Sequence, residues 1–197
     1  SYKMQSLRDN PISSQQEYER LDDVDDPGLS MSLSFEPSVL TAPRINIQRR
    51  RPLVAILREQ GVNGHVEMAA AFDAAGFCTV DLTMSDLLSE FKNLQNFKGL
   101  VACGGFSFGD VLGAGQGWAK TILFNEQLKD MFRDFFHRDD SFTLGVCNGC
   151  QMLRGIKDLI PGSQVWPSFK NNESGQFESR FVMVEVLEND SILLSGM

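Results

Sequence analysis

Residues 142–155 read FTLGVCNGCQMLRG and place a cysteine where an apolar run gives way to a helix-like run. The run FTLGV (142–146) is typical of a buried β-strand, and residues 148–156 are typical of a helix. The pentapeptide GVCNG at their junction fits G-x-C-x-G, the cysteine form of the nucleophile elbow. In that motif the nucleophile stands on a strained turn between a strand and a helix. The stretch therefore predicts an α/β fold and a reactive thiol at Cys147.

Three features of this turn suit a nucleophile. Gly145 and Gly149 stand at positions where side chains would collide with the neighbouring backbone. The sulfur of Cys147 would lie at the N-terminus of a helix, whose dipole favours the thiolate. The backbone amide of Asn148 would point at the place where an oxyanion forms.

Cys147 and Cys150 can also be interpreted as a CxxC pair at a helix start, which is the thioredoxin arrangement. The tryptophan and proline that surround the thioredoxin pair are absent, and the flanking glycines suit an elbow better. A zinc site would need two more ligands, and neither Cys78 and Cys103 nor the two histidines occur at the usual spacing. We expect no metal site, and we expect Cys78, Cys103 and Cys150 to pack inward as small apolar residues.

The rest of the chain from residue 51 alternates strand-like and helix-like runs. Such alternation predicts a parallel sheet covered by helices on both faces, and sites in such sheets form at the carboxyl ends of the strands. The expected strands are 52–57, 77–82, 98–105 and 142–146, and the expected helices are 65–76, 84–91, 119–138 and 148–156.

A second glycine turn follows the third expected strand, in ACGGFSFGD (102–110). Gly104 and Gly105 would end that strand at the same sheet edge as Cys147, so the amide of Gly105 or Phe106 is a natural second oxyanion donor. A phosphate cradle is the competing interpretation, but no P-loop lysine with Ser or Thr follows.

Bulk composition excludes several classes of protein. The 197 residues carry a formal net charge of -8, which argues against non-specific binding of nucleic acid. No apolar run approaches the roughly 20 residues that a membrane span requires, and the N-terminus does not resemble a secretory signal. Four cysteines are too few for a secreted disulfide framework, so we expect a cytoplasmic protein.

Residues 1–50 differ in texture from the rest of the chain. They carry an acidic run at 22–26 and lack a sustained apolar period, so they predict an irregular linker or arm. One short strand near 30–35 is possible because polar and apolar residues alternate there. We accordingly place a domain boundary after residue 50, with residues 51–197 as the second domain.

Four motifs together carry a resemblance to a known family. They are GVCNGCQ (145–151), GGFSFGD (104–110), REQGVNGHVEMAAAF (58–72) and NNESGQFESR (171–180). Over 51–197 the chain resembles class I glutamine amidotransferases with a flavodoxin-like fold. Among them it looks like the glutaminase domain of the large, single-chain phosphoribosylformylglycinamidine synthases, and the arm looks like the connection to their synthase body.

The resemblance implies an activity and a set of site residues. The glutaminase hydrolyses L-glutamine through a cysteine thioester. The synthase body then uses the ammonia, with ATP and magnesium, to convert formylglycinamide ribonucleotide to the amidine in purine biosynthesis. The matching residues are Cys147 as nucleophile; Gly105, Phe106 and Asn148 as the oxyanion hole; and Gln151, Asn172, Ser174, Gln176 and Phe177 as the glutamine site. Without the resemblance, 171–180 reads as a polar surface loop that leads into a strand at 180–187.

The family's catalytic base is a histidine in a His-x-Glu pair, and no such pair occurs before Met197. His137 would end a long helix and His65 would start one, so both have structural explanations. We therefore expect a glutaminase domain truncated in its C-terminal part, negligible turnover by this chain alone, weak labelling by a glutamine-like chloroketone, and no cofactor bound to this part. Its expected partners are L-glutamine and the synthase domain of the same polypeptide.

A flavodoxin-like cysteine hydrolase or stress protein of the intracellular peptidase superfamily is the alternative. That group usually has a histidine directly after the nucleophile, where this chain has Asn148.

Overall fold

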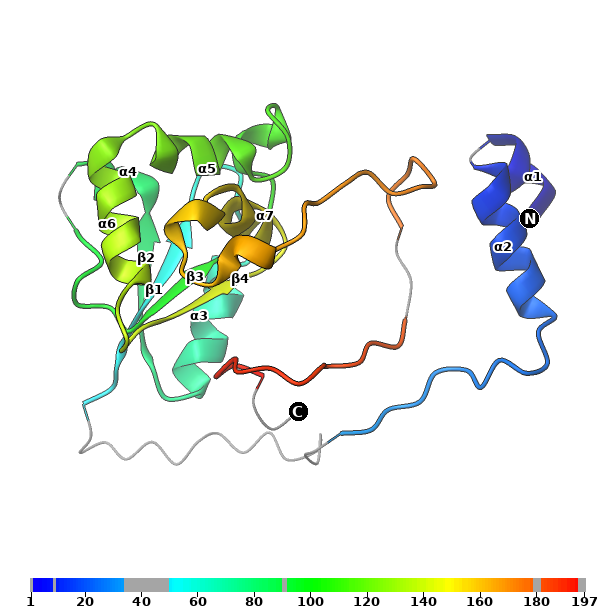
Figure 1. Ribbon diagram of the computed structural model, residues 1–197, viewed down its shortest axis with the longest axis horizontal. Helices are drawn as coiled ribbons and strands as arrows, with labels where there is room; N and C mark the ends of the chain where they lie inside the picture. Colours follow the sequence, from blue (N-terminus) through cyan, green and yellow to red (C-terminus); the bar gives the residue numbers. More distant parts are fainter. Residues whose placement is uncertain (1, 9, 34–49, 90–91, 179–181, 195–197) are drawn as a thin grey trace. The chain divides into compact units, whose positions relative to one another are not determined.

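The computed structural model describes residues 2–8, 10–33, 50–89, 92–178 and 182–194 (Figure 1). The chain divides into two compact units. Residues 40–168 form one unit, which contains a parallel sheet, and residues 1–39 form the other together with 169–197.

The sheet has four parallel strands in the order β2-β1-β3-β4. The strands are β1 (Leu53–Arg58), β2 (Cys78–Thr83), β3 (Gly99–Ala102) and β4 (Phe142–Gly145). This order is that of a flavodoxin-like sheet, and it confirms the predicted fold class. The order reverses direction between β1 and β3, so the loops after these two strands diverge at the sheet edge where such folds place their sites.

Side chains of the strands alternate between two buried layers, as a sheet covered on both faces requires. Leu57 and Leu100 point into the layer that also contains Trp118 of a flanking helix, and all three are fully buried. Ile56 and Val101 point into the opposite layer, where helix residues such as Phe72 cover them. The continuous apolar run of the sequence therefore corresponds to a strand buried on both sides.

The described residues of this unit also form five helices, which lie between or after the strands: α3 (His65–Ala74), α4 (Met84–Leu88), α5 (Gln116–Leu123), α6 (Glu126–Phe136) and α7 (Asn148–Gly155). The prediction of a single helix over 119–138 is wrong, because the helix is interrupted between α5 and α6. The Asn125 side chain accepts a hydrogen bond from the Leu128 amide and so caps the start of α6. Short 3-10 turns occupy Ser107–Asp110, Lys157–Leu159 and Ser163–Val165.

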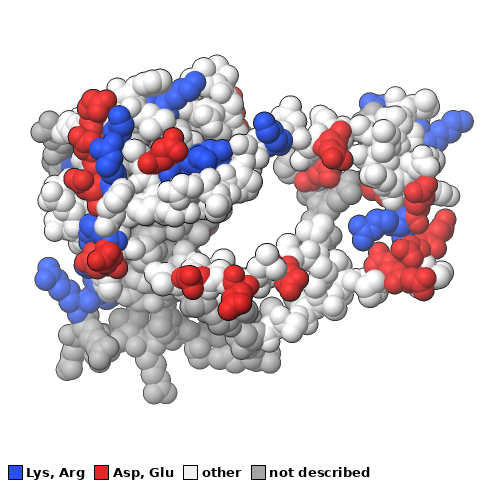
Figure 2. All heavy atoms as spheres, in the orientation of Figure 1, with Lys and Arg blue, Asp and Glu red and all other residues white. Residues whose placement is uncertain are grey.

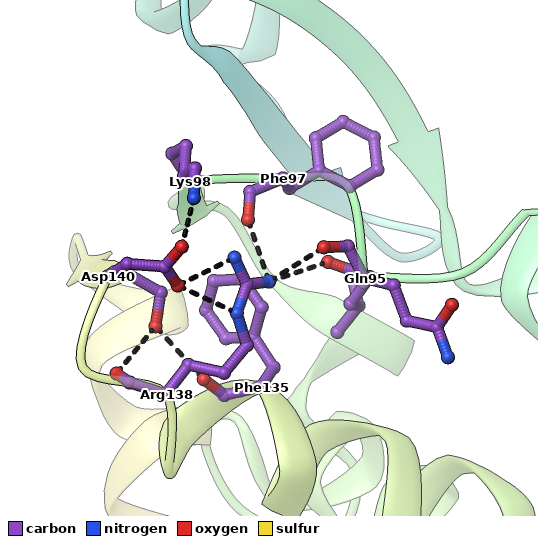
Figure 3. Close-up of polar contacts among 8 residues, drawn as sticks. Gln95, Phe97, Lys98, Phe135, Arg138 and Asp140 are labelled. Carbon is purple, nitrogen blue, oxygen red and sulfur yellow. Dashed lines mark hydrogen bonds and ion pairs between the residues drawn. The ribbon is translucent and has the colours of Figure 1, made fainter.

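The amino ends of β3 and β4 are held together by Arg138, which follows α6 (Figure 3). Its guanidinium donates to the carbonyls of Gln95 and Phe97, both at 2.9 Å, and pairs with Asp140 at 2.9 Å. Lys98 also pairs with Asp140. This network lies at the opposite sheet edge from the carboxyl end of β4.

His137 ends α6 at this same edge, in agreement with its predicted structural role. Its backbone amide donates to the Arg133 carbonyl at 3.1 Å, and its Nδ1 lies 2.8 Å from the same oxygen. The last turn of the helix is thereby closed.

The unit formed by residues 1–39 and 169–197 contains two helices, α1 (Tyr2–Arg8) and α2 (Pro11–Leu21). The expectation of an irregular arm is therefore wrong for residues 2–8 and 11–21. Asn10 caps α2 by accepting a hydrogen bond from the Ser13 amide at 3.0 Å. The rings of Tyr2 and Tyr18 stack at 4.7 Å.

The other described residues of this unit, 22–33, 169–178 and 182–194, form no helix or strand. Residues 30–33 form no strand, and 34–35 lie outside the described residues. The strand anticipated over 180–187 is likewise absent from its described part, 182–187. The acidic run 22–26 is exposed after α2, where Figure 2 shows acidic side chains gathered.

Oppositely charged side chains lie next to one another on the sheet unit in the view of Figure 2. Ion pairs of this unit include Arg51 with Asp73 and Arg133 with Asp130. Within the described ranges, none of the helices is long and apolar enough to cross a membrane.

Candidate active site

Cys147 stands on the turn between β4 and α7, and its backbone is strained. Its φ of 52° and ψ of −112° lie in a region that residues with side chains rarely adopt. The turn is closed by hydrogen bonds from the Gly149 amide to the Val146 carbonyl (2.9 Å) and from the Gln151 amide to the Cys147 carbonyl (3.0 Å). The thiol is exposed at the carboxyl edge of the sheet. This is the backbone geometry that the G-x-C-x-G pattern predicts.

The two glycines of the motif are required by close packing. A Cβ at Gly149 would lie 2.1 Å from the carbonyl oxygen of Ala102 in β3. A Cβ at Gly145 would lie 2.6 Å from Leu153 Cδ1 and 2.9 Å from Cys150 Cα. The first turn of α7 therefore lies directly against the sheet, and this contact fixes the position of the Cys147 thiol.

The glycine turn after β3 lies against the same thiol. A Cβ at Gly104 would be 3.2 Å from Cys147 Cβ and 3.9 Å from its sulfur. Gly105, at φ 132°, forms an antiparallel bridge with Val62 of the loop after β1. Two diverging loops and the elbow thus meet at the edge where a site was predicted.

The bridge decides which amide can serve as an oxyanion donor. The Phe106 amide donates to the Gly61 carbonyl at 2.8 Å, so it is already engaged. Among the residues that the structure describes, the amides of Gly105 and Asn148 donate to no carbonyl oxygen. These two amides are therefore the candidate donors of an oxyanion hole, and Phe106 contributes to the turn instead.

The Asn148 side chain is fully buried and contacts the loop after β3. Its Oδ1 accepts from the Ser107 amide at 3.2 Å, and its Nδ2 donates to Asp110 Oδ1 at 3.0 Å. Gln151 Oε1 lies 3.5 Å from the same Nδ2. Sequence reasoning missed these contacts because it considered only the backbone of Asn148, and Asp110 is 38 positions away in the chain.

The remaining cysteines differ in environment. Cys103 is buried, as predicted, and this burial raises the pKa of its thiol to about 11. Cys150 is exposed, so the expectation that it packs inward is wrong. Its backbone packs on Gly145. Partial desolvation and the neighbouring Cys147 raise the pKa of the Cys150 thiol. Cys78 in β2 is half-buried.

The other predicted glutamine-site residues belong to the unit formed by residues 1–39 and 169–197. Asn172 Nδ2 donates to the Gln176 carbonyl at 2.8 Å, and the Gln176 amide donates to Ser174 Oγ at 3.4 Å. Ser174 is buried, whereas the Phe177 ring is exposed. Ser174, Gln176 and Phe177 line a polar pocket of about 200 Å³ together with residues of α1 and α2. Asn172, Ser174 and Gln176 thus form a compact polar turn.

His65 begins α3 after the loop that follows β1. Its Nδ1 is buried and has no hydrogen-bond partner among the described residues. It lies close enough to Asp81 of β2 to help lower the pKa of that carboxyl, although the Arg58 side chain is the main cause. His65 thus occupies the helix-start position that the sequence predicts.

No group of three or more acidic, cysteine or histidine residues within the described part of the chain could hold a metal ion.

The fold and the elbow define the class of protein. The model of the CobB/CobQ-like glutamine amidotransferase domain matches residues 51–197, and the chain belongs to this family. Its members are enzymes that use glutamine.

Among solved structures, the chain is similar to PurLQS from Thermotoga maritima. The two are 21% identical, and the match covers 54% of this chain and 45% of that chain with a TM-score of 0.43. The matched part thus spans less than half of that relative.

Proposed function

We propose that the chain is the glutaminase portion of a phosphoribosylformylglycinamidine synthase. The observation that carries the proposal is the exposed Cys147 thiol, held on a strained elbow at the carboxyl edge of a parallel sheet. Membership of the glutamine amidotransferase family supports glutamine as the substrate. The resemblance of the motifs GGFSFGD (104–110), GVCNGCQ (145–151) and NNESGQFESR (171–180) supports the narrower assignment.

In the proposed reaction, the Cys147 sulfur attacks the carbonyl carbon of the glutamine side-chain amide. The carbonyl oxygen becomes an oxyanion, which accepts hydrogen bonds from the Gly105 and Asn148 amides. Collapse of this intermediate breaks the carbon–nitrogen bond, and the nitrogen leaves as ammonia after it takes up a proton. Water then hydrolyses the glutamyl thioester to glutamate and restores the thiol.

The proton transfers need a base, and the His-x-Glu pair that supplies it in the resembled family does not occur among these 197 residues. His137 directly follows α6, and His65 begins α3, so both keep the structural explanations given by the sequence. We therefore expect negligible glutamine hydrolysis by these 197 residues alone, and substantial turnover would refute this expectation. A His-x-Glu pair in the sequence encoded after Met197 would support the assignment to this family of synthases.

The remaining parts of the proposal follow from the resemblance. Ammonia would be consumed at an ATP- and magnesium-dependent site in the synthase body, and residues 1–50 would connect to that body. The same proposal includes a cysteine nucleophile, a whole enzyme of the carbon–nitrogen ligase class and a cytoplasmic location. The Ser174–Phe177 turn and Gln151 would bind glutamine.

The experiment that tests the proposal measures protection of Cys147. L-Glutamine should slow the alkylation of this thiol by iodoacetamide, whereas D-glutamine at the same concentration should not. A cysteine hydrolase of the peptidase type would instead cleave short peptides in a manner abolished by Cys147→Ala. Peptide cleavage, or equal protection by the two enantiomers, would overturn the glutaminase assignment.

A further inference from the structure

The turn that follows the candidate oxyanion donor is held in an unfavourable conformation. Phe108, Gly109 and Asp110 have φ values of 53°, 60° and 55° in succession. For the two residues that carry side chains, the left-handed conformation costs about 1 kcal/mol or more each. Such a conformation persists only where surrounding contacts hold it.

Backbone hydrogen bonds hold part of this turn, such as those from the Phe108 amide to the Gln60 carbonyl (3.2 Å) and from the Gly109 amide to the Phe106 carbonyl (2.9 Å). One side chain contacts it at both ends. The amide group of Asn148 reaches both ends of the turn, because its oxygen accepts from the Ser107 amide and its nitrogen donates to the Asp110 carboxylate. Asn148 is fully buried and so is Ser107, so water does not compete for the Ser107 contact. Asn148 therefore links α7 to the turn through two hydrogen bonds of opposite polarity.

This link connects the helix that follows the nucleophile Cys147 with the loop that carries the Gly105 amide, the candidate oxyanion donor. Asn148 directly follows Cys147, and Ser107 is two residues after Gly105. On its other side, the Gly105 region is fixed by the bridge to Val62 and by the hydrogen bond from the Phe106 amide to Gly61. With both sides fixed, the Gly105 amide has a defined direction relative to the Cys147 sulfur.

We propose that the Asp110 carboxylate and the Asn148 side chain are positioning residues, which hold the loop after β3 so that the Gly105 amide faces the oxyanion formed at Cys147. The proposal deepens the glutaminase assignment and rests on it for its catalytic meaning. It predicts that loop protection and Cys147 alkylation depend on which of the two side chains donates the hydrogen bond and which accepts it. A general packing role would not show this dependence.

The polarity follows from the chemistry of the two groups. An aspartate at 148 could still accept from the Ser107 amide but could not donate to Asp110, and two carboxylates would then face each other at about 3 Å. An asparagine at 110 keeps an acceptor for the Asn148 nitrogen. With both changes, the amide at 110 can donate to the carboxylate at 148, so the pair is complementary again.

The first readout is hydrogen exchange of the peptide that covers residues 104–110. Asp110→Ala removes the partner that holds the Asn148 side chain in place, and Asn148→Asp drives the two carboxylates apart. Although the side chain at 148 keeps an acceptor, each change should displace it and so lower the protection of the Ser107 amide at least tenfold. Asp110→Asn and the double variant Asn148→Asp/Asp110→Asn should keep most of it. Asp158→Ala, on an exposed 3-10 turn, is the matched control. Unchanged protection in Asp110→Ala and Asn148→Asp would overturn the proposal whatever the activity of the protein.

The second readout is the ratio of two alkylation rates at Cys147. A glutamine-like chloroketone places its ketone oxygen in the oxyanion hole, whereas iodoacetamide needs only the thiol. Asp110→Ala and Asn148→Asp should lower the ratio about tenfold to a hundredfold, and the double variant should restore it to within about fivefold of the original. Equal losses in both rates, or no recovery in the double variant, would overturn the positioning role.

The two readouts separate the proposal from its premise. If the unmodified chain shows no preference for the chloroketone and no protection by L-glutamine, the glutaminase assignment fails. The exchange data then still decide whether Asn148 and Asp110 hold the loop.

Discussion

The substitution Gly149→Ala tests the packing that places the Cys147 thiol. Gly149 is the second residue of α7, and its backbone is not in the left-handed region. By helix propensity alone, alanine there should stabilise the helix by about 1 kcal/mol. The structure predicts the opposite sign, because a Cβ would lie 2.1 Å from the Ala102 oxygen and 2.5 Å from its carbonyl carbon.

The magnitude follows from how far the two elements must separate. A Cβ essentially never approaches a heavy atom within 3.0 Å, so α7 has to move away from β3 by about 1 Å. The obstacle is strand backbone, which cannot rotate aside as a side chain can. Overpacking of this kind costs up to about 3 kcal/mol, which leaves a net loss of about 2 kcal/mol after the propensity gain. For a domain of this size the melting temperature should fall by about 6–10 °C.

The assay is thermal unfolding followed by tryptophan fluorescence. Both tryptophans, Trp118 and Trp166, belong to the sheet unit and report its unfolding. Gly162→Ala is the matched control, because its φ is +78° and no atom lies within 4 Å of an added Cβ. It should cost about 1 kcal/mol from backbone strain alone. If Gly149→Ala is as stable as the unmodified chain or more stable, the close approach of α7 to β3 is wrong.

Three further predictions concern other parts of the sheet unit. Arg138→Ala removes the charged donor that joins the amino ends of β3 and β4 and should lower the free energy of unfolding by about 2 kcal/mol, measured by urea denaturation. The Thr83 amide and hydroxyl lower the pKa of Asp86, so Asp86→Asn should destabilise the chain by about 1 kcal/mol at pH 7. The difference from the unmodified chain should shrink as the pH falls below about 4, through the lowered pKa of the folded state; a constant difference down to pH 2 would contradict this. Burial raises the pKa of Cys103 to about 11, so only about 0.1% of this thiol is ionised at pH 8 and iodoacetamide should leave it unmodified until the chain unfolds, by mass spectrometry.

The sheet and the elbow could be predicted because their signals are local. Continuous apolar runs such as LVAIL in β1 require burial on both faces, and this identifies parallel strands directly. The glycines around Cys147 mark positions where only a residue without a side chain fits. Strand, turn and helix then follow in the order that the motif demands.

The misassigned elements depend on competition between local and distant contacts. The amphipathic period continues through α5 and α6, so it could not show that Asn125 caps a new helix. Ser14 is buried in α2, whereas apolar Ile12 and Leu21 are exposed, so hydrophobic periodicity gives no signal for that helix. The starts of α2 and α6 are marked by the capping side chains of Asn10 and Asn125.

The contacts around the thiol were beyond sequence reasoning for a different reason. Whether the amide of Gly105 or of Phe106 is free depends on the bridge between Gly105 and Val62, which joins two separate loops. The pairing of Asn148 with Asp110 likewise depends on how the loop after β3 folds over α7. Both contacts depend on how separate loops meet in the folded chain, and the spacing of residues along the sequence does not predict that.

The most direct test of the account locates the adduct of a glutamine-derived chloroketone by peptide mass spectrometry. We expect slow labelling of Cys147 that L-glutamine suppresses, that Cys150→Ala retains and that Cys147→Ala abolishes. An adduct on Cys150, or labelling of Cys147 that L-glutamine does not affect, would contradict the conclusion that this elbow is the site of glutamine attack.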